Sequence, residues 1–179
     1  GEEIAKLLAE QGAHVIVSSR KIDDCQTVAD AIKADGGSAE AFACHIGEMA
    51  QIEAVFEHIK SSHGKLDILV NNAAANPYFG HILDTPVSAF DKTVDVNLRG
   101  YFYMSVAGAK LMKDNGGGAI VNVLSAGAII AVPNMGGYSP SKFASRAASD
   151  CIRAELEPQG TQVSALIVGS VDTRMASHV

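Results

Sequence analysis

The 179-residue chain fits one domain with a real hydrophobic core, because 47% of its residues are apolar and 19% are charged. Its net charge is -6 and its lysines and arginines are scattered, which excludes the basic surface that binds a nucleic-acid backbone. No apolar run approaches the roughly 20 residues of a membrane helix, and the first residues do not resemble a secretion signal. We therefore expect a cytoplasmic protein with no nucleic-acid or membrane partner.

Helix-like and strand-like stretches alternate along the chain, and glycines mark several boundaries. The first helical stripe consists of Ile4, Leu7 and Leu8 and stops before Gly12. In chain order, the predicted helical stretches are 4–8, 25–32, 52–59, about 87–113 and about 138–157. The apolar runs between and after them predict strands at 14–19, 40–44, 66–72, 119–125 and 162–168.

This alternation predicts an α/β fold of the Rossmann type, a doubly wound parallel sheet with helices on both faces. In such a sheet, ligands bind at the carboxyl ends of the strands. Unusual polar residues follow four of the predicted strands: Ser18, Ser19, Arg20, His45, Asn71, Asn72 and Ser125. We expect them to converge on one binding edge.

The two ends of the chain are unusual for this fold. Gly1 leads directly into a helix, whereas a dinucleotide-binding domain normally begins with a strand and a glycine-rich turn. The other end stops shortly after a strand. We therefore expect residues 1–179 to form a single domain that is incomplete at both ends, without its first strand and its C-terminal part.

The cysteines and histidines give no sign of a metal site. Cys25, Cys44 and Cys151 lack the spacing of metal ligands and are interpreted as free, buried thiols. The six histidines are dispersed along the sequence, and none forms a ligand pattern with another histidine or a cysteine. The sequence predicts no metal.

Five motifs occur in a fixed order and carry a family resemblance. They are "NNAAAN" at 71–76, Asn97 in "VNLRG", Ser125, the pair Tyr138 and Lys142, and "VGSVDT" at 168–173. With these motifs the chain resembles the classical short-chain dehydrogenase/reductases over essentially its whole length. The segments "SSRK", "CHIG" and "NNAAANPYFGHILD" are most similar to the DHRS4-like carbonyl reductases of that family.

The spacing of Tyr138 and Lys142 suits acid–base chemistry. Reduction of a carbonyl needs a proton donor at its oxygen, and a phenol with a pKa near 10 needs a nearby positive charge to give its phenolate form. Residues four apart share one face of a helix, so Lys142 can supply that charge to Tyr138. Ser125 is expected to hold the substrate oxygen. The resemblance implies that Asn97 positions a water and that Lys142 also binds the nicotinamide ribose.

The end of the strand at 14–19 indicates the cofactor. Ser19 followed by Arg20, with help from Ser18, suits the 2'-phosphate of NADP, whereas NAD, which stays an alternative, is favoured by an acidic residue. The alternative is that Arg20 is a solvated loop residue. The resemblance adds further cofactor-binding candidates: Gly1, His45, Ile46, Asn72, Ala73, Tyr138, Lys142, Gly169, Val171 and Thr173.

The leading hypothesis is an NADP(H)-dependent oxidoreductase that transfers a hydride between the nicotinamide and a small-molecule carbonyl or alcohol. Two alternatives remain: a non-catalytic nucleotide-binding regulatory module, and a structural fragment without a nucleotide site. In the second alternative, Tyr138 and Lys142 are only a half-buried tyrosine and a solvated lysine on an amphipathic helix. The resemblance also implies a homodimer or homotetramer formed through the helices around 87–113 and 138–157.

Overall fold

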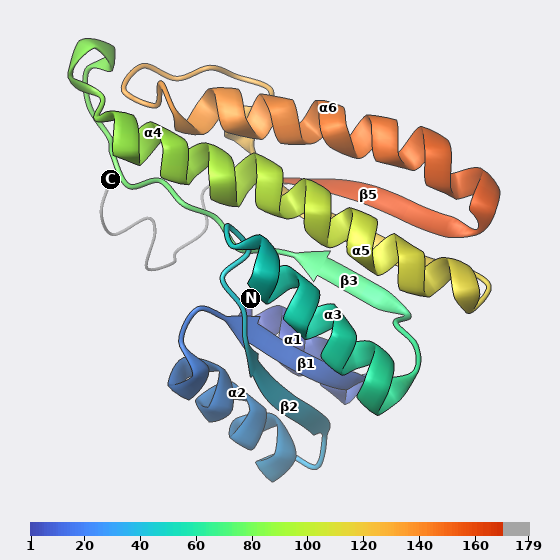
Figure 1. Cartoon of the computed structure of the whole chain (residues 1–179). Coiled ribbons are helices and arrows are strands. Elements are labelled where there is room, and N and C mark those ends of the chain that lie inside the picture. The colour runs from blue at the N-terminus through green and yellow to red at the C-terminus, as the bar shows by residue number, and fades with distance from the viewer. Residues whose placement is uncertain (170–179) are drawn as a thin grey trace.

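The computed structural model describes residues 1–169 and confirms the predicted alternation of strands and helices (Figure 1). The strands are β1 (His14–Ser19), β2 (Ser38–Ala43), β3 (Ile68–Asn71), β4 (Gly118–Ser125) and β5 (Thr161–Val168). The longer helices are α1 (Glu2–Glu10), α2 (Ile22–Ala34), α3 (Met49–His63), α4 (Val87–Val94), α5 (Tyr101–Asp114) and α6 (Tyr138–Leu156). The short helical segments are η1 (Ile82–Asp84), the π-helical η2 (Asp95–Gly100), η3 (Ala126–Ala128) and η4 (Glu157–Gln159). None of the helices within residues 1–169 has both the length and the apolar character needed to cross a membrane.

All strand pairs are parallel, which confirms the predicted fold class. The strands are divided between two sheets, one with the order β1-β2 and one with the order β3-β4-β5. Ser19 pairs with Ala43 at the end of the first sheet, and Ser125 pairs with Val168 at the end of the second. Within each sheet, the carboxyl ends of the strands therefore lie side by side.

Helices cover both faces of the two-stranded sheet. Val15 and Val17 of β1 pack with α1 and α2 around Ala39, whereas Ile16 and Phe42 point to the opposite face and pack with α3. Figure 1 shows this arrangement, with α1 behind β1 and α3 in front of it. Because successive strand residues point to opposite faces, the continuous apolar run in β1 packs against helices on both faces of the sheet.

The three-stranded sheet is covered differently. Met112 of α5 and Ile152 of α6 pack on Ile120 of β4 in the main core. Large apolar side chains such as Ile68 and Leu166 remain exposed; Leu166 is 50% exposed. The expectation of helices on both faces therefore holds around β1 and β2, whereas within residues 1–169 the β3-β4-β5 sheet keeps exposed apolar side chains.

Helix α1 buries other residues than its apolar stripe predicts. Leu7 is 58% exposed, whereas Ala5 and Ala9 are buried against the two-stranded sheet. Gly37 explains part of this close packing, because a Cβ atom at that position would lie only 3.2 Å from Cβ of Ala9. Small side chains, and not the largest ones, thus form the buried face of α1.

The cysteines are free thiols, as predicted. Cys25 and Cys44 are buried, as expected, but the expectation of a buried thiol is wrong for Cys151, which is exposed on α6. Burial raises the pKa of the Cys44 thiol to about 11, so this group stays protonated and unreactive at neutral pH.

Candidate active site

The end of β3 lies beside β4 and against the start of α1. Asn71 ends β3 and pairs with Asn122 of β4. The next residue, Asn72, approaches Gly1 so closely that a Cβ atom on Gly1 would lie 2.9 Å from its Nδ2 atom. The start of α1 and the end of β3 therefore touch, although 70 residues separate them in the sequence.

Lys142 is buried beneath Tyr138, at the start of α6. Its side chain is 1% exposed, and Nζ donates a long hydrogen bond of 3.5 Å to the carbonyl oxygen of Val123. Nζ also lies 4.9 Å from the ring centroid of Tyr101 and 5.7 Å from that of Tyr138. Burial lowers the pKa of Lys142 to about 8, so the ammonium is present at neutral pH but is costly to keep.

Tyr101 forms the other side of the lysine site. It is buried, its hydroxyl donates a 3.0 Å hydrogen bond to the same Val123 carbonyl, and its ring faces the Lys142 ammonium. Burial and the neighbouring Tyr138 both raise the pKa of Tyr101, which keeps its phenol neutral. Because Tyr101 is neutral, its electron-rich ring can stabilise the lysine charge without an ion pair.

Ser125 lies at the end of β4, where the chain turns towards Tyr138. Its Oγ atom accepts a 3.1 Å hydrogen bond from the backbone N–H of Gly127 and so begins η3. This turn packs on the tyrosine, because a Cβ atom on Gly127 would lie 3.3 Å from Cε1 of Tyr138. Gly127 thus contacts both Ser125 and Tyr138 and links the end of β4 to the start of α6.

Asn97 lies fully buried in the π-helical segment η2. Its Oδ1 atom accepts a 2.7 Å hydrogen bond from the N–H of Ala75, and its Nδ2 atom donates to the Ala75 carbonyl at 2.9 Å and to Oγ of Ser141 at 3.0 Å. Asn97 thus joins the loop after β3 to the first turn of α6. Single-turn π segments are often found at functional sites, and this one aims an amide between two elements of the candidate site.

The predicted cofactor residues at the end of β1 are exposed. Ser18 and Arg20 extend into solvent, and Ser19 turns back towards Lys21 and Cys25. The Ser19 Oγ atom lies 3.1 Å from Sγ of Cys25. Arg20 and the neighbouring Lys21 therefore both carry exposed charge at this strand end, and Ser19 is partly engaged by its own loop.

His45 and Ile46 shape the end of β2. The N–H of Gly47 donates a 3.0 Å hydrogen bond to Nδ1 of His45, which fixes the imidazole over its own turn. Ile46 contacts two core clusters, and a Cβ atom on Gly100 would lie 2.6 Å from its carbonyl oxygen. Only a glycine at position 100 therefore lets η2 approach this loop.

An apolar pocket of about 280 Å³ lies near the start of α6. One of its walls is formed by Gly136, two residues before Tyr138. The lining residues are Ile82, Thr85, Val87, Phe90 and Gly136.

The model of the short chain dehydrogenase family matches residues 1–179 of this chain. The chain belongs to the short-chain dehydrogenase family. It is 36% identical to the pig (Sus scrofa) dehydrogenase/reductase SDR family member 4 over 176 residues, which are 98% of this chain and 63% of that protein. The predicted resemblance to the classical family, and to this group within it, is confirmed. The chain spans about 63% of the length of this curated relative.

Solved structures of short-chain dehydrogenases have the same fold. A metagenomic short-chain oxidoreductase in complex with NADP is 30% identical, with a TM-score of 0.90 over 95% of this chain and 77% of that chain. The gluconate 5-dehydrogenase of Burkholderia cenocepacia J2315, in complex with NADP and tartrate, is 27% identical, with a TM-score of 0.93 over 99% of this chain and 70% of that chain. The strand order and the helices around it are therefore those of a known enzyme family.

The structure places the motif residues of this chain in two groups. The first surrounds Lys142: Tyr138 and the turn after Ser125 lie beside it, and Asn97 hydrogen-bonds the preceding residue, Ser141. The second lies along the strand ends and consists of Gly1, Ser18, Ser19, Arg20, His45, Ile46, Asn72, Ala73 and Gly169. Val171 and Thr173 lie outside the described residues.

Sequence reasoning missed a buried polar network that holds the site together. Nδ2 of Asn71 donates to Oδ1 of Asn122 at 2.8 Å, and Nδ2 of Asn122 donates to Oγ of Ser149 at 2.9 Å. Ser149 in turn donates to the carbonyl of Ser145, and Ser145 donates to the carbonyl of Asn97. The spacing of Ser141, Ser145 and Ser149 at every fourth position of α6 was the available signal, because it places three hydroxyls on one helix face.

Proposed function

We propose that this short-chain dehydrogenase transfers a hydride between NADP(H) and a small-molecule carbonyl or secondary alcohol, with Tyr138 as the proton donor and acceptor. The observation that carries the proposal is the buried Lys142 ammonium, 5.7 Å from the Tyr138 ring. Among residues 1–169 no carboxylate forms an ion pair with Lys142. Its charge is therefore free to act on the phenol.

In the reduction, the nicotinamide supplies the hydride when NADPH is bound. The Ser125 hydroxyl donates a hydrogen bond to the carbonyl oxygen and holds it next to Tyr138. Tyr138 gives its phenolic proton to that oxygen while the carbonyl carbon becomes tetrahedral, and Lys142 stabilises the phenolate that remains. Alcohol oxidation uses the same residues in reverse.

Asn97 acts as a positioning residue in this proposal. Its amide fixes Ser141, which follows Tyr138 by three residues, and Oγ of Ser141 donates to the Tyr138 carbonyl at 2.6 Å. The first turn of α6 is therefore held by a hydrogen bond from outside the helix and by one within it. This support keeps Tyr138 and Lys142 in register with the end of β4.

The residues along the strand ends fit a dinucleotide. The close approach of Gly1 to Asn72 leaves room only for backbone at the start of α1, where N–H groups and the helix dipole favour a phosphate. The exposed Arg20, with Lys21 after it, supports a 2'-phosphate and hence NADP in preference to NAD. The two solved relatives described above contain NADP.

The proposed assembly is a homodimer or homotetramer formed through α5 and α6. Large aromatic side chains are exposed on these helices: Phe102, Tyr103 and Phe143. Exposed aromatic residues are enriched in protein interfaces, which supports a subunit contact on this side of the molecule. Sedimentation velocity on the wild-type protein and on Phe143→Lys tests this assembly, because a charge there should favour the monomer.

The decisive experiment measures the absorbance of the reduced nicotinamide with a panel of ketones, aldehydes and alcohols. Wild-type protein, Tyr138→Phe and the matched control Tyr103→Phe are compared with NADPH and NADH. We expect turnover that prefers NADPH, survives in Tyr103→Phe and falls by roughly 10²–10⁴-fold in Tyr138→Phe.

A separate measurement of NADPH binding by fluorescence distinguishes the remaining alternatives. Binding without turnover on any substrate would contradict the proposed reaction and favour a regulatory nucleotide-binding module. Absence of binding would contradict the cofactor assignment and favour a structural fragment.

A further inference from the structure

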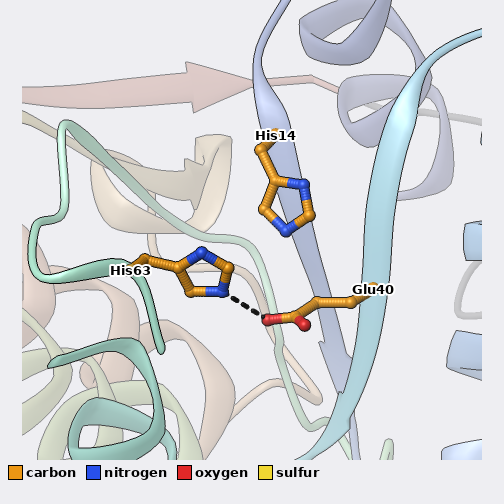
Figure 2. Close-up of side chains that lie close together, drawn as sticks. All are labelled: His14, Glu40 and His63. Carbon is orange, nitrogen blue, oxygen red and sulfur yellow. Dashed lines mark hydrogen bonds and ion pairs between the residues drawn. The ribbon is translucent and has the colours of Figure 1, made fainter. Parts of the chain in front are cut away.

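Three histidines gather around one glutamate at the amino ends of β1 and β2. His14 begins β1, Glu40 lies in β2, and His58 and His63 come from the last turns of α3. Figure 2 shows His14 and His63 directed towards the Glu40 carboxylate. The histidines are dispersed in the sequence, but the fold brings half of the six together.

The fold explains why these side chains meet. His14 and Ile16 share one face of β1, and Glu40 and Phe42 share the same face of β2, because strand residues two apart point the same way. Ile16 and Phe42 pack against α3, so His14 and Glu40 also face this helix near its end. The cluster lies about five strand residues, roughly 16 Å, from the cofactor residues at the other end of β1.

Distances within the cluster are short. Nε2 of His63 lies 2.8 Å from Oε1 of Glu40, and Nε2 of His58 lies 2.9 Å from the same oxygen. The rings of His14 and His63 have centroids 4.9 Å apart. One ligand atom from each of His14, Glu40 and His63 lies within 4.8 Å of the other two.

Neighbouring groups orient these side chains. Oγ of Ser38 is 2.7 Å from Nδ1 of His14, which leaves the Nε2 atom of His14 for another partner. His58 stacks on Phe42, with ring centroids 4.8 Å apart. Outer contacts of this kind fix the rings of metal-binding histidines in known sites.

The Glu40 carboxylate is the charged centre of the cluster. Partial burial raises its pKa, but the hydrogen bonds from His63 and His58 and their positive charge outweigh burial, so that the pKa of Glu40 is lowered overall. Glu40 is therefore an anion throughout the neutral range. Its side chain is 31% exposed and those of His58 and His63 are each 30% exposed, which leaves room for an ion to enter.

We propose that His14, Glu40 and His63 bind one divalent transition-metal ion, with Zn²⁺ as the best match. Two imidazoles and one carboxylate are a ligand set that suits Zn²⁺, and water takes the fourth tetrahedral position. Ligand atoms around tetrahedral Zn²⁺ lie roughly 3.3 Å apart. Binding therefore needs only small side-chain shifts: His14 moves inwards, and Nε2 of His63 and Oε1 of Glu40, now 2.8 Å apart, separate slightly. His58 keeps its hydrogen bond to Glu40 and supports the ligating carboxylate.

The proposed ion has a structural role. Its ligands come from β1, β2 and α3, so a bound ion would tie the two-stranded sheet to the helix that covers it. The site is far from Tyr138 and Lys142 in the fold, and the proposal does not rest on the proposed reaction. Mg²⁺ is not expected to bind, because it prefers oxygen ligands.

The test is calorimetric titration of the tag-free, chelator-treated protein with Zn²⁺, with Co²⁺ as a spectroscopic probe. We expect one Zn²⁺ per chain, the visible absorption bands of tetrahedral Co²⁺, and a rise in melting temperature with Zn²⁺ but not with Mg²⁺. Affinity should fall as the solution is acidified, because protons compete with the metal for the imidazole nitrogens of His14 and His63.

Three variants decide whether the assigned residues are the ligands. Glu40→Gln and His63→Asn should each weaken Zn²⁺ binding by about 100-fold or more, whereas His81→Asn, at an exposed histidine outside the cluster, should not. His14→Asn should also remove the tetrahedral Co²⁺ spectrum, because His14 supplies one of the three protein ligands. Absence of Zn²⁺ binding, equal binding by all variants, or loss of binding in Cys151→Ser alone would overturn the proposal.

Discussion

The two ends of the parallel strands hold their polar residues in opposite ways. At the carboxyl end, Lys142 is 1% exposed and Asn97 is fully buried, and both are held by backbone carbonyls and a hydrogen-bonded network. At the amino end, Glu40 and His63 remain about 30% exposed and contact each other directly. In the first arrangement the side chains are fixed in one geometry, and burial makes the charged form of Lys142 less stable. In the second arrangement the charged groups stay hydrated and can bind other partners. Burial thus distinguishes the proposed active site, whose polar groups are held in one arrangement, from the proposed metal site, whose charged groups stay in contact with water.

The largest expected effect is that of Lys142→Met. The variant should lose roughly 10²-fold or more in turnover, because the Tyr138 phenolate loses its neighbouring charge. It should nevertheless gain up to about 3 kcal/mol in free energy of unfolding without nucleotide, since the lowered pKa of Lys142, about 8 against 10.5, measures the cost of the buried charge. Steady-state kinetics and urea unfolding test both parts; a variant that is active or less stable would contradict this account.

The same residue predicts a pH dependence of stability. The pKa of Lys142 is lowered in the folded protein, so between pH 8 and 10.5 the unfolded chain binds more protons than the folded one. The contribution of Lys142 to the free energy of unfolding should therefore become more favourable as pH rises through this range. The stability difference between Lys142→Met and wild type should shrink towards pH 10.5, and a constant difference would show that the lysine is not titrating there.

Ser149→Ala should weaken the network on which the carboxyl edge depends. The change removes the acceptor of the 2.9 Å hydrogen bond from Asn122 and leaves a buried amide N–H without its partner. We expect a loss of about 1–3 kcal/mol in the free energy of unfolding. The control Ser88→Ala, at an exposed position of α4, should change it by less than about 0.5 kcal/mol. Equal effects of the two variants would mean that the network adds little.

Local patterns explain why much of the fold could be predicted. The strands follow from short apolar runs, which contain β-branched residues in every strand except β2. The proximity of Tyr138 and Lys142 follows from a spacing of one helical turn. Both signals depend only on residues that are close together in the sequence. The burial of Ala5 instead of Leu7 did not follow, because packing against another element decides which side of a short helix is covered.

The missed parts of both sites involve contacts between distant positions. Tyr101 contacts Lys142 from a different helix, and no periodic pattern relates the two residues. His14 and His63 likewise meet only because β1 and α3 pack together. The regular spacing of serines in α6 was visible in the sequence, but nothing in the sequence indicated that Asn122 bonds to one of them. Sequence patterns thus predicted the motif residues, but not the residues that contact them and fix their positions.

The smallest expected effect comes from the amino end. Without metal, Glu40→Gln should lower the free energy of unfolding by less than about 1 kcal/mol at pH 6, because its partly exposed pairs with His58 and His63 are weakened by solvent. The pKa of Glu40 is lowered from 4.5, since the histidine hydrogen bonds outweigh the opposing effect of burial. The contribution of the carboxylate should therefore be complete above pH 4.5 and disappear as pH falls through its lower folded pKa. Chemical unfolding with a chelator present tests this, and adding Zn²⁺ should enlarge the difference at pH 7.5. A large chelator-resistant loss would instead mean that Glu40 is a structural residue comparable with Asn97.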